Sequence, residues 1–325
     1  MLKGSKRLFS FALALMLLAG LSVAMPQVAN AIDVGVGSGL VTDTSGTSLT
    51  GNQVYYGEYG GSPILWRVVA KDASTVTLFC HGAVVNDRVY CSCSAAHHDW
   101  TGSDVCAWLN GTVGPHSPAN YTSTGFLPTS FSAAERAAIK PQYSTDQEQG
   151  LSGNPYIPNQ TIVLPSVAEV EDSGTWGMSQ SNRVFASNWW WLRSPGFYLS
   201  RNAALVYGDG SVDAPGLNVI NDNAVRPAFK LNLSSALFTS AAAGGKSGAV
   251  GAILSAAQPT TGAVKLTIAD PALTLGNLTP TAVNGRTITF DYAAGTTLGK
   301  TLSAVVMNGA TLRYYSQLEA STAAS

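Results

Sequence analysis

The stretch Trp189–Pro195 reads WWWLRSP and places three consecutive indoles just ahead of an arginine. In an extended strand, alternate side chains point to opposite faces, so Trp189 and Trp191 are predicted to share one face and Trp190 to take the other. We expect at least one face to pack in a core. The other face can present an indole for stacking on a sugar ring or for contact with another protein. Arg193 is expected to form a buried pair or to cap the sheet.

The composition of the chain changes sharply on either side of this stretch. Residues 54–235 hold all seven Trp, all four Cys and all four His of the 325-residue sequence. Residues 32–53 are rich in Gly, Ser and Thr and are predicted to be a linker. The run AAAGGKSG at 241–248 marks a second predicted linker, which we place at 236–248. Residues 249–325 then form a predicted C-terminal domain.

The central domain is predicted to be α+β, with short helices and an antiparallel sheet. Strands are expected at Gln53–Tyr59 and Ile64–Ala70, joined by a Gly60-Gly61 turn, and at Ser74–Cys80. Three short helices have visible starts, because a serine precedes each. Their signals are Ser103 before Asp104–Asn110, the capping box from Ser132 to Glu135, and the capping box from Ser166 to Glu169.

The C-terminal domain has a different pattern. Strand-like runs lie at Ala263–Ala269, Arg286–Tyr292, Thr301–Met307 and Thr311–Tyr315, and turns such as Asn284-Gly285 separate them. Short strands with such turns predict a small all-β domain resembling an immunoglobulin-like sandwich. No closing strand is apparent after Tyr315. The two open alternatives are a sequence that is a fragment and a sandwich that lacks an edge strand.

An ordered series of motifs in the central domain resembles DUF6273, a domain of unknown function common in exported bacterial proteins. The resemblance covers residues 54–233 and rests on ILWRVV (64–69), WLN (108–110), FSAAE (131–135), LPSVAE (164–169), WLRSP (191–195), GDGSV (208–212) and VRPA (225–228). The closing pattern is also similar to C-type-lectin-like domains, which implies a twisted antiparallel sheet with short helices. Fold analogy alone assigns no activity.

The cysteines are the first candidate site. Cys80, Cys91, Cys93 and Cys106 lie close together in the sequence, and an even number of cysteines in an exported chain predicts disulfides. Pairing of the near-neighbours Cys91 and Cys93 is geometrically awkward. The open alternatives are Cys80–Cys91 with Cys93–Cys106, or Cys80–Cys106 with another arrangement. Zinc bound by these thiolates with His81, His97 or His98, and a thiol nucleophile beside His97 or His98, are the sharper alternatives.

The polar stretch from Asp209 to Asn223 is the second candidate site. It offers oxygen ligands of the kind that calcium prefers, although turn chemistry accounts for the same residue types. Together with the tryptophans, it gives the predicted ligand-binding residues: Trp189, Trp190, Arg193, Asp209, Asp213, Asn221, Asp222 and Asn223. No catalytic residue and no resident cofactor is assigned; calcium and zinc are the two ions that remain open.

Charge and the N-terminal residues bear on location. Only 11% of residues are charged, and Lys+Arg 18 nearly cancel Asp+Glu 19, which excludes a polybasic nucleic-acid binder. Lys3, Lys6 and Arg7 precede an apolar run, and Ala29-Asn30-Ala31 matches a small-x-small cleavage pattern. We therefore expect a signal peptide at 1–31, cleaved between Ala31 and Ile32, and no membrane span in the mature chain. An uncleaved anchor is the alternative.

These observations predict an exported or surface protein with a noncatalytic binding or adhesion role. The expected ligand is a glycan or a surface protein, gripped near Trp190, Arg193 and the polar stretch. An extracellular enzyme built on the Cys/His cluster and a purely structural envelope subunit are the two rival hypotheses.

Overall fold

The structure is a computed structural model. It describes residues 9–10, 53–93, 99–116, 119–145, 156–171, 176, 178–196, 201–241, 255–256, 263–268, 279–284, 287–291, 301–308 and 311–320. The predicted signal peptide at 1–31 and the predicted linker at 32–53 lie outside these residues, apart from 9–10 and 53. No helix within the described residues is long and apolar enough to cross a membrane.

A seven-stranded sheet forms one side of the main body, in the order β14-β16-β2-β3-β4-β13-β6. Its strands are β2 (Gln53–Tyr59), β3 (Ser62–Lys71), β4 (Thr75–Cys80), β6 (Ile139–Lys140), β13 (Ala228–Asn232), β14 (Ala236–Ala241) and β16 (Val264–Ile268). The predicted turn at Gly60-Gly61 is confirmed. Both glycines have positive φ, at 59° and 77°, which the tight turn between antiparallel β2 and β3 requires.

A five-stranded sheet follows, in the order β11-β10-β9-β12-β5. Its strands are β5 (Val85–Val89), β9 (Trp190–Pro195), β10 (Asn202–Val206), β11 (Val212–Asn218) and β12 (Asp222–Val225). The WWWLRSP stretch thus supplies the central strand, because β9 lies between β10 and β12. All six β9 residues are buried, so both faces of this strand pack in the interior.

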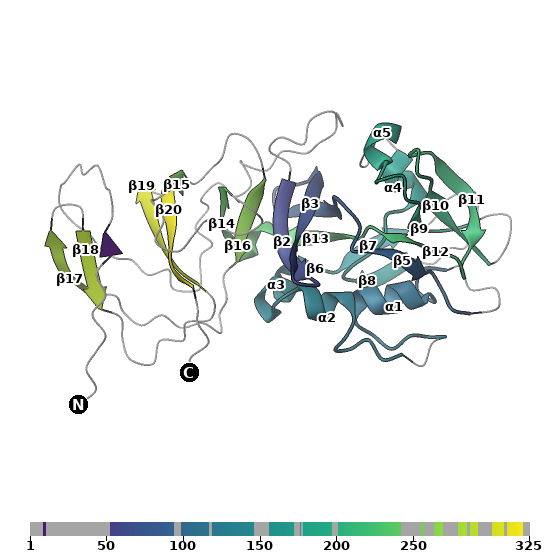
Figure 1. The fold of residues 1–325 in the computed structure, drawn as a ribbon, viewed down its shortest axis with the longest axis horizontal. Coiled ribbons are helices and arrows are strands. Elements are labelled where there is room, and N and C mark those ends of the chain that lie inside the picture. The colour runs from purple at the N-terminus through teal and green to yellow at the C-terminus, as the bar shows by residue number, and fades with distance from the viewer. Residues whose placement is uncertain are drawn as a thin grey trace.

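The helices are short and flank the sheets. They are α1 (Asp104–Asn110), α2 (Phe126–Ser130), α3 (Ala133–Ala138), α4 (Val167–Glu171), α5 (Gln180–Arg183) and the 3₁₀ turn η1 (Leu233–Ser235). In Figure 1, α1, α2 and α3 line the lower side of the main body, and α4 and α5 lie at its upper side. The predicted caps are confirmed. The Ser103 side chain accepts a hydrogen bond from the Cys106 amide, Ser132 and Glu135 form a reciprocal capping box, and Gly111 ends α1 in the left-handed conformation.

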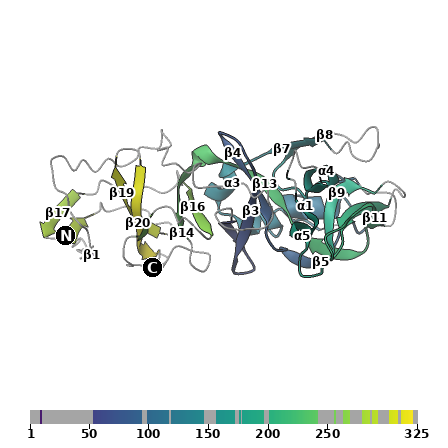
Figure 2. The same cartoon turned by 90° about the horizontal axis from the view of Figure 1, so that it is seen from above.

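The remaining strands form small sheets outside the main body or at its edge. They are β1 (Phe9–Ser10), β7 (Gln142–Thr145), β8 (Tyr156–Gln160), β15 (Ser255–Ala256), β17 (Thr279–Asn284), β18 (Thr287–Asp291), β19 (Thr301–Asn308) and β20 (Thr311–Ala320). Sheets β1-β18-β17 and β15-β20-β19 are separate from each other. Figures 1 and 2 agree that the hairpins β17–β18 and β19–β20 follow one another beyond the β14–β16 edge of the main body.

The expected α+β class is wrong, because the described residues are mainly β. The capping motifs marked where helices start, but α1, the longest of α1–α5, has only 7 residues. The expected C-type-lectin-like mixed domain is therefore wrong. The described residues form a mainly β domain with two principal sheets.

The expected separate C-terminal sandwich is also not formed as a single unit. Strand β16, predicted as part of it, hydrogen-bonds to β14 and runs parallel to β2, so it extends the seven-stranded sheet. The edge of β2 offers unpaired backbone groups, and pairing with β16 satisfies them. Strand β14 lies within the segment predicted to be a linker at 236–248, so this segment begins with a strand.

One aromatic core joins the two principal sheets. The largest fully buried side chains include Trp66, Trp100, Trp190, Trp191, Tyr90, Phe79, Phe126 and Phe229. The Trp66 and Phe229 rings meet edge to face at 4.7 Å across the seven-stranded sheet, and Trp190 packs against Phe79 at 5.7 Å. This core fixes the position of β9 and hence of the residues at its start.

Candidate binding surface

The three consecutive tryptophans have different environments. Trp190 and Trp191 are fully buried, whereas Trp189 is 44% exposed. The Trp190 Nε1–H donates to the Arg183 carbonyl at 3.0 Å, and the Trp191 Nε1–H donates to the Arg88 carbonyl at 2.9 Å. The prediction that Trp190 presents its indole at the surface is therefore wrong. Both faces of β9 are covered, and Trp189 is exposed because it precedes the strand.

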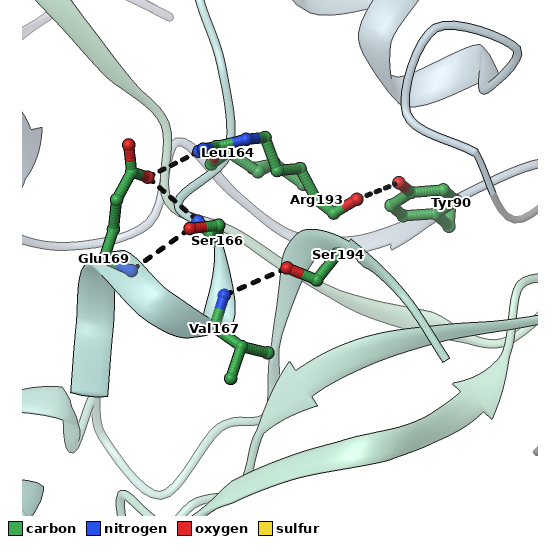
Figure 3. Close-up of polar contacts among 7 residues, drawn as sticks. All are labelled: Tyr90, Leu164, Ser166, Val167, Glu169, Arg193 and Ser194. Carbon is green, nitrogen blue, oxygen red and sulfur yellow. Dashed lines mark hydrogen bonds and ion pairs between the residues drawn. The ribbon is translucent and has the colours of Figure 1, made fainter. Parts of the chain in front are cut away.

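Arg193 is also interior and lies outside any surface site. Its guanidinium forms an ion pair with Glu169 and donates to the Leu164 carbonyl at 2.8 Å (Figure 3). The Arg193 side chain is only 2% exposed. Of the two roles expected for it, the buried pair is the one observed.

The surroundings of Arg193 connect α4 to β9. Glu169 accepts from the Ser166 amide at 2.9 Å, and Ser166 Oγ accepts from the Glu169 amide at 3.1 Å, which confirms the predicted capping box. Figure 3 shows Ser194 Oγ accepting from the Val167 amide, and the Tyr90 hydroxyl donating to the Arg193 carbonyl. Residues of the WLRSP motif thus take part in a polar network that holds helix α4 against the central strand β9.

The exposed Trp189 ring lies against Tyr207. The two rings meet nearly edge to face, at 72° with centroids 4.8 Å apart. The Tyr207 hydroxyl donates to Asp213 Oδ2 at 2.6 Å. Asp209 lies close enough to act on Tyr207 electrostatically. These four residues, Trp189, Tyr207, Asp209 and Asp213, are called the Trp189 surface below.

The turn from Tyr207 to Ser211 needs its two glycines. A Cβ on Gly208 would lie 2.3 Å from the Ser187 carbonyl oxygen, and one on Gly210 would lie 2.0 Å from the Gln180 carbonyl oxygen. Gly210 also has φ of 82°. The GDG motif therefore allows the turn to pack directly on the backbone of residues 180–187. Arg183 Nε holds it there by donating to the Gly210 carbonyl at 2.8 Å.

The chain just before Trp189 adopts an uncommon conformation. Ala186 and Ser187 have φ of 45° and 60°, the only positive values among the described non-glycine residues. Such conformations cost on the order of 1–3 kcal/mol each and cluster at functional sites, where the surrounding structure enforces them. Here the strained turn at Ala186 and Ser187 directly precedes the exposed Trp189 indole.

The electrostatics of the Trp189 surface keep Tyr207 protonated. The hydrogen bond to Asp213, with burial and the nearby carboxylates, raises the pKa of Tyr207 to about 12. Hydrogen bonds from the Ser211 hydroxyl and amide lower the pKa of Asp209 below its usual range. At neutral pH the surface thus combines two aromatic rings with two acidic residues, Asp209 fully ionised and Asp213 accepting from the phenol.

The other predicted ligand-binding residues do not join this surface. Asn221 donates to the Asn218 carbonyl at 2.9 Å within its own turn, and Asp222 pairs with Val89 in the sheet. Asn223 is only 5% exposed. The stretch from Asp209 to Asn223, predicted as one polar loop, is divided by strand β11, so its oxygen atoms do not converge as expected for a calcium loop.

The cysteines pair differently from every arrangement considered in the sequence. Cys91 and Cys93 form a disulfide with a Cα–Cα distance of 5.3 Å, while Cys80 and Cys106 are buried free thiols. The prediction of two disulfides is wrong. Cys80 lies at the end of β4 and Cys106 in α1, where each packs in the core and has no cysteine partner. His97 and His98 lie outside the described residues.

The free thiols are poorly suited to nucleophilic chemistry. Burial raises the pKa of Cys80 to about 12 and raises that of Cys106 well above its usual range. The Cys106 thiol borders a cavity of about 260 Å³ and donates to Gln160 Oε1 at 3.2 Å. Because the thiolate is the reactive form, both cysteines behave as structural groups.

Sequence reasoning missed two residues that the structure places at candidate sites. Tyr207 directly precedes the GDG turn, and an aromatic residue at a turn that follows a buried strand is a signal that could have identified it. His116 lies near the Cys91–Cys93 disulfide, as described below. Nothing in its spacing from the cysteines resembles a metal motif, so the sequence carried no signal for it.

Comparison with known proteins gives one match. The family model described as Domain of unknown function (DUF6273) matches residues 74–233. The match includes the whole Trp189 surface and the Cys91–Cys93 disulfide but begins after β3, whereas the resemblance noted in the sequence started at residue 54. No curated protein matches the chain, and no solved structure matches it. Residues 74–233 of this chain are therefore similar to the DUF6273 family.

Proposed function

We propose that this protein is an exported, noncatalytic binding protein whose DUF6273-like domain holds a glycan on the Trp189 surface. The observation that carries the proposal is the 44% exposure of Trp189, although the two tryptophans that follow it are fully buried. An exposed indole braced edge to face by a second ring offers a flat apolar face to the C–H groups of a sugar.

The polar groups around the indole suit the same ligand. Asp209 places acceptor oxygens beside the ring, and Asp213 accepts the hydrogen bond of the Tyr207 hydroxyl. A ligand rich in hydroxyl groups requires polar partners of this kind. The two carboxylates also disfavour an acidic ligand. A neutral or basic glycan is therefore the preferred class, and a protein ligand is the alternative outcome of the test.

The contacts of the buried charged groups favour binding over catalysis. Arg193 pairs with Glu169, and Arg226 donates to the carbonyls of Gly82, Arg183, Cys80 and His81. Arg226 also lies over the Phe79 and Trp190 rings, at 4.5 and 4.8 Å. These charges are committed to holding the fold together. The raised pKa values of the two buried free thiols also argue against a thiol enzyme that uses Cys80 or Cys106 as its nucleophile.

The test is a glycan array probed with the full mature chain, residues 32–325, and with two variants. Trp189→Ala removes the stacking ring, and Ile220→Ala removes another large exposed side chain, 54% exposed, in the same domain. We expect sugar signals for the wild type and Ile220→Ala and their loss in Trp189→Ala. Absence of any sugar signal, or equal signals in the two variants, would overturn the proposal.

Export is part of the proposal and has its own test. Lys3, Lys6, Arg7 and the apolar run that follows support a cleaved signal peptide. Expression of the full chain in a bacterial host should release a protein whose first residue is Ile32. Retention of Met1 in a membrane fraction would instead indicate an uncleaved anchor.

A further inference from the structure

The Cys91–Cys93 disulfide has a histidine beside it. The Sγ atoms of Cys91 and Cys93 and one imidazole nitrogen of His116 all lie within 4.8 Å of one another. This is the one group of three potential metal ligands of the types His, Cys, Asp and Glu found among the described residues. Cys91 is fully buried, while His116 is exposed and reaches the cluster from the solvent side.

One carboxylate holds the two halves of this cluster together. Asp104, at the start of α1 and 3% exposed, accepts from the Ser92 amide at 2.8 Å and from the Ser92 hydroxyl. Its other oxygen accepts from the His116 amide at 3.3 Å. Asp104 thus joins the segment that carries the cysteines to the segment that carries His116, and neither connection uses the sulfur atoms.

The segment from Cys91 to Cys93 is also suited to a thiolate. The Cys93 amide points at Cys91 Sγ at 3.4 Å, a contact that stabilises negative charge on that sulfur once the disulfide is opened. The amide of Cys91 is itself fixed by the Val219 carbonyl at 3.0 Å. The backbone that carries the two sulfurs is therefore held by groups other than the disulfide.

We propose that reduction of the Cys91–Cys93 disulfide creates a zinc site formed by Cys91, Cys93 and His116. A phosphine or thiol reductant supplies two electrons, and two protons from water complete two thiols. Zinc binding then releases these protons, because the thiolates are the ligands. Zn–S bonds of about 2.3 Å and a Zn–N bond of about 2.0 Å place tetrahedral ligands about 3.4–3.8 Å apart. The three ligand atoms already lie within 4.8 Å of one another, and the two bonded sulfurs move apart once the disulfide is opened.

Three protein ligands leave a fourth zinc position for water or a ligand. The disulfide acts as a gate, since the oxidised sulfurs cannot donate thiolates. This proposal is independent of glycan binding on the Trp189 surface and stands or falls separately.

The experiment uses the full mature chain in two forms, untreated and reduced with tris(2-carboxyethyl)phosphine, and adds Zn²⁺ or Co²⁺ alone. We expect one equivalent of Zn²⁺ in the reduced form and none in the oxidised form. Co²⁺ should show tetrahedral d–d bands and a sulfur-to-cobalt charge-transfer band only after reduction. No metal uptake after reduction, or equal uptake before it, would overturn the proposal.

Variants locate the metal. His116→Ala, an exposed position where folding is least affected, should weaken Zn²⁺ binding at least about tenfold, the lower range seen when even an outer-shell partner is lost. The matched control is His81→Gln, a histidine next to the free thiol of Cys80, which should bind Zn²⁺ like the wild type. Unchanged binding in His116→Ala, or loss confined to His81→Gln, places the metal elsewhere and contradicts the proposal.

Discussion

Arg193 in the central strand β9 and Glu169 in helix α4 form a buried ion pair in which the carboxylate also completes the capping box of α4. One oxygen, Glu169 Oε2, thus neutralises an interior charge and caps a helix. Arg193, predicted to bind a ligand, instead links helix α4 to the strand that it covers.

Glu169→Gln should destabilise the fold. Removing one partner of a buried ion pair leaves an uncompensated charge and costs about 3–5 kcal/mol, and the 17% exposure of the glutamate side chain places the expected loss toward the lower end. The measurement is urea unfolding followed by tryptophan fluorescence. Glu171→Gln, on the exposed side of the same helix, is the control and should stay within about 0.5 kcal/mol of the wild type. Equal stability of the two variants contradicts this role for Arg193.

Substitutions of Trp189 and Trp190 should differ in their effect on the free energy of unfolding. Trp190→Ala removes a fully buried ring packed on Phe79 and is expected to cost about 3–5 kcal/mol of unfolding free energy. Trp189→Ala should lose much less, because nearly half of its surface already contacts solvent. Thermal unfolding of both variants checks this order; a Trp189→Ala loss as large as that of Trp190→Ala shows that the indole is structural.

The pKa of Tyr207 should depend on Asp213. The hydrogen bond raises the pKa of Tyr207 to about 12, so the folded state holds this proton more tightly than the unfolded chain does. Its contribution to stability is present in full below the unfolded pKa of about 10 and is lost as the pH rises toward 12. NMR titration of the Tyr207 ring should show the pKa falling in Asp213→Asn. An unchanged pKa means that the hydrogen bond has no such role.

The number of reactive thiols follows from the disulfide. Alkylation in denaturant without reductant should label two cysteines, Cys80 and Cys106, and peptide mass spectrometry should find Cys91 and Cys93 unlabelled and linked. In the native protein neither free thiol should react quickly, because both are buried and hold their protons. Four blocked cysteines would restore the two-disulfide arrangement.

Local sequence signals predicted local structure well. Gly60-Gly61 indicated the first hairpin, Ser103 indicated the start of α1, and Ser166 with Glu169 indicated the start of α4. Each of these depends on a hydrogen bond or a backbone conformation within a few residues, so the residue types alone decide it.

The long-range pairings were not predictable in this way. Nothing in the run that forms β16 distinguishes pairing with β2 from pairing within a separate sandwich, because both choices satisfy the same alternating pattern. The order of exposure at Trp189–Trp191 likewise depends on where β9 begins and on the covering of both its faces. The close spacing of Cys91 and Cys93 argues against a bond between them, yet the two form a disulfide across a single intervening residue.

The most direct test of the central proposal follows the seven indole N–H signals of the chain during a sugar titration. The probe is the oligosaccharide that gives the strongest array signal, added to the ¹⁵N-labelled mature protein. The proposal predicts that the Trp189 signal shifts in proportion to occupancy. The Trp190 and Trp191 signals, held by the Arg183 and Arg88 carbonyls, should stay in place. A bound sugar that leaves the Trp189 signal unmoved while shifting another indole would contradict it.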